Sequence, residues 1–139
     1  MASYVLQKMA RKLPGMVIKP IPKPKPKVTE GFGKRAKVGE ICKKAGYRSV
    51  MLITDMTLFS LGYHNIVVES LKKNEINCVV FHDICSEPNT DIIDAGRHVA
   101  FESNAECIIA LGGGSVLDSS KMIAAGVKLK HLSSNALLL

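Results

Sequence analysis

The sequence has no tryptophan, and aromatic residues make up only 5% of its 139 positions. It has no apolar run near the roughly 18 residues that a membrane-spanning helix needs, which excludes that class of protein. No two of its four cysteines stand at Cys-x-x-Cys spacing, which argues against a zinc or thiol-redox motif. We therefore expect a cytoplasmic chain with an ordinary apolar core and no membrane partner.

Acidic residues are absent from positions 1–28, which carry seven lysines and arginines. Residues 29–139 carry 12 basic and 12 acidic side chains, so the net charge of +7 belongs to the first segment. Such an arm can bind nucleic acid, but no aromatic residues interleave its lysines, which favours a solvated segment. It repeats Pro-Lys and is poorer in arginine and serine than a mitochondrial transit peptide. We expect a basic, Pro/Lys-rich segment at 1–28, no nucleic-acid partner, and one domain at 29–139.

Three short, mainly apolar runs begin 29 residues apart, at positions 49, 78 and 107. They read SVMLIT, CVVFH and CIIAL, which is typical of strands buried on both faces of a parallel sheet. Helical patterns precede, separate and follow these runs, at residues 38–45, 58–73, 91–102 and 116–125. Gly46 and Gly126 are expected to end the first and last of these helices. The order predicts an α/β fold with a doubly wound parallel sheet.

The last 13 residues, 127–139, end on three leucines without a cap or a polar tail. We expect a domain that is incomplete in this chain. An open sheet edge and the terminal leucines favour self-association into a homo-oligomer.

A glycine-rich turn, GGGS at 112–115, follows the third apolar run and opens the last predicted helix. Glycines let the backbone approach a phosphate closely, and the free amides of a helix start attract anions. Ser115 is predicted to be the N-cap, with Asp118 completing a capping pattern. The turn is neither a G-x-G-x-x-G motif, because Leu117 takes the third glycine position, nor a P-loop. A well-capped helix without any ligand stays open as the alternative.

Asp94 and His98 stand four residues apart on a predicted helix, a spacing that can present two ligands to one metal. His64, His82 and His131 are scattered and supply no further ligand cluster. We therefore expect a helix-surface contact at this pair and no metal site in the chain.

The segment GGGSVLDSSK at 112–121, placed after a short apolar strand, resembles the iron-containing alcohol dehydrogenase family. Other matching pieces fall in the same order within residues 17–128: GFG at 31–33, LITD at 52–55 followed by Gly62, and EPNT at 87–90. The resemblance implies a Rossmann-like NAD-binding domain. The whole enzyme would transfer hydride between NAD(H) and a small alcohol or aldehyde, with iron(II) polarising the substrate oxygen.

The resemblance also implies roles for individual residues. Asp55 would lie near the adenosine ribose and favour NAD over NADP, and residues 112–115 (Gly112, Gly113, Gly114 and Ser115) would hold the pyrophosphate. Asp118 and Lys121 would lie toward the nicotinamide, and Asn89 would touch the cofactor. The family's metal ligands, one Asp and three His, belong to a C-terminal helical domain, so no catalytic residue and no turnover are expected of this chain alone. A glycerol-dehydrogenase or dehydroquinate-synthase relative, or a non-catalytic nucleotide-binding or assembly module, stays open.

Overall fold

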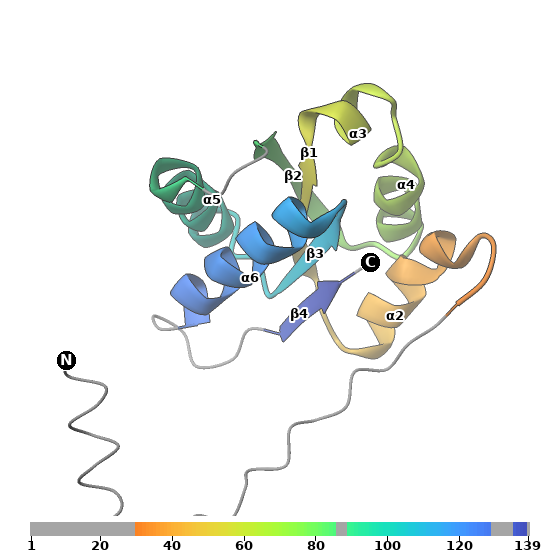
Figure 1. The fold of residues 1–139 in the computed structure, drawn as a ribbon. Coiled ribbons are helices and arrows are strands. Elements are labelled where there is room, and N and C mark those ends of the chain that lie inside the picture. The colour runs from red at the N-terminus through yellow and green to blue at the C-terminus, as the bar shows by residue number, and fades with distance from the viewer. Residues whose placement is uncertain (1–29, 86–88, 129–134, 139) are drawn as a thin grey trace, which may run out of the picture.

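The structure, a computed structural model, describes residues 30–85, 89–128 and 135–138. The basic segment 1–28 lies outside these residues. Four parallel strands form one sheet in the order β2-β1-β3-β4, with helices on both faces (Figure 1). The predicted doubly wound α/β fold is confirmed. Among the described helices, none is long and apolar enough to cross a membrane.

The strands follow the three apolar runs and add a fourth. They are β1 (Ser49–Asp55), β2 (Asn77–Ile84), β3 (Cys107–Leu111) and β4 (Asn135–Leu138). The expectation of an unsupported leucine end is wrong for residues 135–138, because they pair in register with residues 107–110 of β3. A strand of four residues carries too little pattern to predict, and its pairing with β3 is a tertiary contact.

In the described part of the chain, five α-helices and one short 3-10 helix surround the sheet. They are η1 (Lys34–Lys37), α2 (Val38–Lys44), α3 (Met56–Ser60), α4 (Asn65–Lys73), α5 (Thr90–Glu102) and α6 (Gly114–Lys128). Gly46 follows α2 with a φ of 84°, as expected of a residue that ends a helix.

Two helix predictions were wrong. The single helix expected over 58–73 is two helices, because the chain turns between them at Gly62, whose φ of 74° is left-handed. The last helix begins at Gly114 and continues through Gly126 to Lys128. Gly126 therefore does not end the helix. A Cβ at that position would meet only the outer end of the Arg97 side chain.

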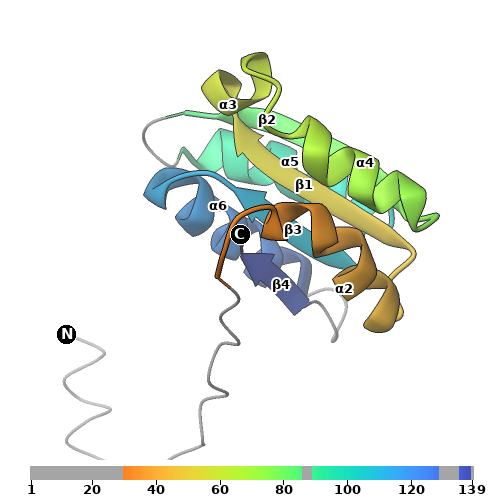
Figure 2. The same cartoon turned by 90° about the vertical axis from the view of Figure 1, so that its right-hand side faces the viewer.

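The strand side chains alternate between two apolar layers. Met51 and Ile53 of β1 pack with α5 and α6, whereas Val50 and Leu52 pack with α2 and α4. These two pairs of helices cover opposite faces of the sheet (Figure 2). All four are fully buried. Each burial stabilises the fold by roughly 1.5–3 kcal/mol before the entropic cost of ordering is counted. The two layers hold β1 rigidly in the middle of the molecule.

The topology creates a crevice at one edge of the sheet. The chain leaves β1 toward β2 through α3 and α4, and it leaves β3 toward β4 through α6. These connections run to opposite sides of the sheet. In open α/β sheets, ligands bind outside the carboxyl ends of the strands where neighbouring connections diverge in this way. The ends of β1 and β3 are that point here.

Candidate functional site at the carboxyl edge of the sheet

A cleft of about 630 Å³ lies at this edge. It is lined by residues 55–58 from the end of β1 and the start of α3, by Ile84 and Cys85 at the end of β2, and by residues 113–116 at the start of α6. Its volume lies in the range of roughly 300–1,000 Å³ that is usual for small-molecule sites. Segments far apart in the sequence thus meet at the switch point of the sheet.

The three glycines of the turn differ in what surrounds them. A Cβ at Gly112 would lie 2.6 Å from Cγ2 of the buried Val116, so the packing of α6 requires glycine there. A Cβ at Gly113 or Gly114 would meet nothing within 4 Å, and neither residue has a positive φ. Neither packing nor backbone conformation explains why positions 113 and 114 are glycine. The space beside them belongs to the cleft, so these two glycines leave room for a ligand.

The start of α6 is suited to an anion. The amide of Leu117 donates to the carbonyl of Gly113 at 3.0 Å, which closes the first turn. The amides of Gly113 and Gly114 precede this bond and have no intrahelical acceptor. The first turn contains no acidic residue that would neutralise the positive end of the helix dipole. The prediction of Ser115 as N-cap is wrong, because the helix has already begun at Gly114. Glycine at the cap is itself tolerated.

Asp55 enters the cleft from the other side. Its Oδ1 accepts a 2.9 Å hydrogen bond from the amide of Leu58, so this carboxylate is the N-cap of α3. The carboxylate is half-buried and also lines the cleft. One oxygen therefore has a structural task, while the charge of the group remains at the mouth of the site.

The other predicted cofactor contacts lie outside the cleft lining. Asn89 caps α5, with its Oδ1 accepting from the amide of Asp91 at 2.9 Å. Asp118 and Lys121 form an exposed ion pair with each other at 3.2 Å. The structure thus brings Asp55 together with Gly113, Gly114 and Ser115 at one cleft. Asn89, Asp118 and Lys121 do not line that cleft.

Sequence reasoning missed six residues that line the cleft. Four are neighbours of predicted contacts (Met56, Thr57, Leu58 and Val116), and two come from a third segment, Ile84 and Cys85. Ile84 belongs to β2, which runs two residues beyond the predicted end at His82. A spacing of three residues from Phe81 would place Ile84 on the opposite face of a regular strand. The two share one apolar layer because the register with β1 shifts between them, an irregularity that the sequence does not signal. Cys85 carries no sequence signal of its own and reaches the cleft only because β2 lies beside β1.

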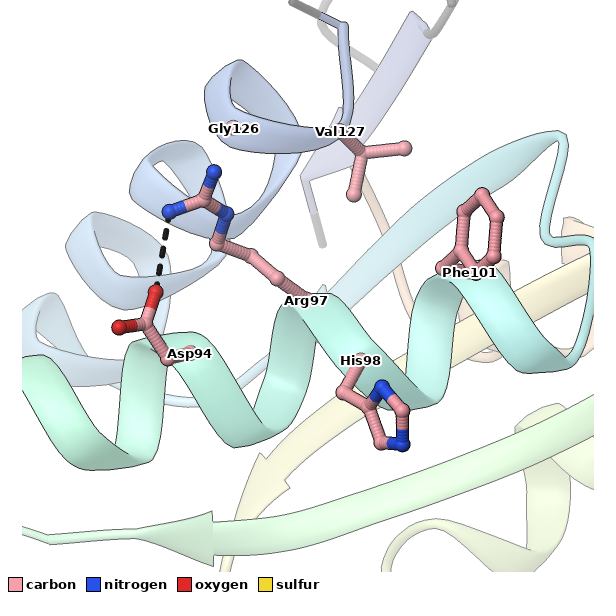
Figure 3. Close-up of a pocket in the computed structure, with 6 residues that line it drawn as sticks. All are labelled: Asp94, Arg97, His98, Phe101, Gly126 and Val127. Atoms are coloured by element: carbon pink, nitrogen blue, oxygen red, sulfur yellow. Dashed lines mark hydrogen bonds and ion pairs between the residues drawn. The ribbon is translucent and has the colours of Figure 1, made fainter. Parts of the chain in front are cut away.

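The pair Asp94 and His98 faces a separate groove of about 260 Å³ between α5 and α6 (Figure 3). Asp94 points toward Arg97, which it contacts at 3.0 Å, whereas His98 points the other way and contacts Glu102 at 3.1 Å. Within residues 30–85, 89–128 and 135–138, no group of three or more His, Cys, Asp or Glu side chains could hold a metal ion. The described residues therefore do not fit an iron centre.

Comparison with known proteins decides the family. The model of the family described as "Iron-containing alcohol dehydrogenase" matches residues 24–137. The chain belongs to the iron-containing alcohol dehydrogenases. It is 33% identical over 101 residues to NADH-dependent butanol dehydrogenase A of Clostridium acetobutylicum, covering 73% of this chain and 26% of that protein. It is 30% identical over 107 residues to choline dehydrogenase of Bacillus subtilis, covering 77% of this chain and 26% of the relative.

Solved structures of this family share the fold. The crystal structure of NADH-dependent butanol dehydrogenase A from Thermotoga maritima superposes with a TM-score of 0.65 at 32% identity, over 73% of this chain and 28% of that one. The chain thus spans about a quarter of the length of the relatives it matches. The cleft at the ends of β1 and β3 lies within the matched residues.

Proposed function

We propose that this chain is the N-terminal, NAD-binding part of an iron-dependent alcohol dehydrogenase. The whole protein would transfer hydride between NAD(H) and a small alcohol or aldehyde. The observation that carries the proposal is the pair Gly113 and Gly114, which no feature of the fold requires and which open onto a cleft at the switch point. Similar proteins include NADH-dependent butanol dehydrogenases, which supports the same cofactor.

Each side of the cleft has a task in this proposal. The amides of Gly113 and Gly114 and the helix dipole of α6 bind the pyrophosphate, with the glycines allowing the close approach. The outward carboxylate oxygen of Asp55 accepts hydrogen bonds from the ribose hydroxyls and repels a 2′-phosphate. Bound nicotinamide supplies the hydride chemistry. Asn89, Asp118 and Lys121 remain predicted contacts that act from outside the cleft lining.

The remaining parts of the reaction belong to the whole protein. Iron would polarise the substrate oxygen there, but the described residues offer it no ligand set, so no step is assigned to them. On the same proposal, the whole protein is a cytoplasmic homo-oligomer without a nucleic-acid or membrane partner. The balanced charge of residues 29–139 supports the absence of a nucleic-acid partner for this domain.

Asp55→Asn tests the cofactor assignment, because asparagine keeps an N-cap oxygen for Leu58 but removes the charge. Isothermal titration of residues 1–139 should show tighter binding of NAD⁺ than of NADP⁺. In Asp55→Asn, the affinities for NAD⁺ and NADP⁺ should become more alike, while the thermal stability stays unchanged. Asp55→Ala is the matched control, since it also loses the cap and should cost about 1 kcal/mol of stability. A preference for NADP⁺ that persists in both variants would overturn the assignment.

A further inference from the structure

Thr54 lies where the two sides of the cleft meet. It is fully buried, and its Oγ1 donates a 2.8 Å hydrogen bond to the carbonyl of Leu111. The two residues are register partners at the ends of β1 and β3. Thr54 directly precedes Asp55, and Leu111 directly precedes the glycine turn. One side-chain bond therefore ties the residue before the carboxylate to the residue before the phosphate-binding amides.

The hydroxyl of Thr54 is the feature that needs an explanation. Thr54 is one of four buried polar or charged residues in the described part of the chain, and its strand neighbours Ile53 and Leu52 are apolar. Valine has almost the same branched shape and an equally high preference for strands, so it would fill this position without a buried polar group. A buried hydroxyl requires a partner, and the partner here is a carbonyl at the point where the two strands part.

The direction of the chain explains why a side-chain bond is useful at this point. After Thr54 the chain turns into α3, and after Leu111 it turns into α6 on the opposite face of the sheet. The regular ladder between β1 and β3 ends with this pair. Beyond it, the spacing between Asp55 and Gly113 depends on how firmly the two strand ends are joined.

We propose that Thr54 is a positioning residue of the dinucleotide site, whose hydroxyl sets the spacing between Asp55 and the amides of Gly113 and Gly114. The inference rests on the proposed function. A ligand that contacts both sides at once gains affinity when their spacing is fixed in advance. A ligand that contacts the glycine turn alone gains nothing from that spacing. Thr54 thus acts on the bridging ligand through Asp55 and Leu111, without touching it.

Two probes separate these cases in Thr54→Val. ADP-ribose carries the pyrophosphate and the adenosine ribose, whereas inorganic pyrophosphate can occupy only the turn. Binding of both to residues 1–139 is measured by amide chemical-shift titration, with thermal unfolding recorded for each variant. The variant should lose about tenfold in affinity for ADP-ribose and keep its affinity for pyrophosphate. Thr54→Ser keeps the hydroxyl and should bind both probes like the wild type.

The outcomes distinguish a failure of the positioning role of Thr54 from a failure of the proposed NAD site. If the wild type binds ADP-ribose and Thr54→Val binds it equally well, the positioning role is wrong while the NAD site stands. Equal losses for both probes would also refute the role, since they would indicate general damage to the turn. If Thr54→Val does not fold, the serine variant decides, because loss of ADP-ribose affinity in that variant contradicts a role for the hydroxyl. A wild type that binds neither probe overturns the proposed function itself.

Discussion

Alanine at Gly112 and alanine at Gly114 should have different effects on stability and on cofactor binding, although the two glycines belong to the same short turn. A Cβ at Gly112 would lie 2.6, 2.8 and 3.1 Å from three side-chain atoms of Val116, which is itself 2% exposed. A Cβ at Gly114 would lie in open space on the cleft side. Gly112→Ala therefore perturbs the core, and Gly114→Ala perturbs only the ligand.

The expected magnitudes follow from these surroundings. Overpacking a methyl group against Val116 should destabilise Gly112→Ala by about 1–3 kcal/mol. Alanine is favoured over glycine by up to about 1 kcal/mol inside a helix, and by less at the first residue, so Gly114→Ala should be as stable as the wild type or slightly more stable. Its methyl group would hold a phosphate away from the amides and should weaken NADH binding by at least about tenfold.

Urea unfolding followed by circular dichroism measures the first effect, and NADH fluorescence titration measures the second. Gly113→Val is the stronger form of the same test, with NADH binding abolished and the dichroism spectrum unchanged. The reasoning fails if Gly114→Ala binds NADH like the wild type. It also fails if Gly114→Ala is destabilised as much as Gly112→Ala, because the open space beside position 114 would then be absent.

Three further results are expected. Burial raises the pKa of the Cys78 thiol from 9.0 to about 11. The unfolded chain therefore loses this proton first, and the free energy of unfolding falls as pH rises from 9 to 11. In urea unfolding, the wild type should lose about 2 kcal/mol more than Cys78→Val over that interval, and equal losses would contradict the raised pKa. Lys121→Ala should change stability by under about 0.5 kcal/mol, because the ion pair between Lys121 and Asp118 is exposed. A lower NADH affinity in this variant would support the predicted contact of Lys121 with the cofactor, and an unchanged affinity would refute that contact. When residues 1–139 are mixed with ferrous iron, NAD⁺ and short alcohols, the absorbance of NADH should not rise, because the chain spans only about a quarter of the length of its relatives. Turnover in this assay would refute the expectation that the chain alone is inactive.

The sheet could be predicted because its central strands β1 and β3 are buried on both faces. Continuous apolar runs at a spacing of 29 residues leave few alternatives to parallel strands with crossover helices, and β3 was predicted with its observed bounds. The break between α3 and α4 was not predicted, since helical spacing continues through Gly62 and only the left-handed backbone there reveals the turn. β4 was also missed, because a strand of four residues has too short a pattern to recognise and forms by pairing with β3.

The site was predictable in part. The glycine turn was identified from local sequence and Asp55 from the family resemblance, and the structure places Asp55, Gly113 and Gly114 at one cleft. The different surroundings of Gly112 and Gly114 could not be predicted, because they depend on where Val116 packs. The bond from Thr54 to Leu111 joins residues 57 positions apart and becomes visible only when β1 and β3 are paired.

The most direct measurement is the location of NAD⁺ on the protein in solution. A titration of ¹⁵N-labelled residues 1–139 with NAD⁺ reports on each amide separately. The largest shift changes should occur at Gly113, Gly114 and Asp55, while Arg97 and Gly126, in the groove between α5 and α6, serve as the internal control and stay unchanged. If millimolar NAD⁺ leaves the glycine amides unmoved, or if the changes centre on the α5–α6 groove, the cleft at the ends of β1 and β3 is not the cofactor site.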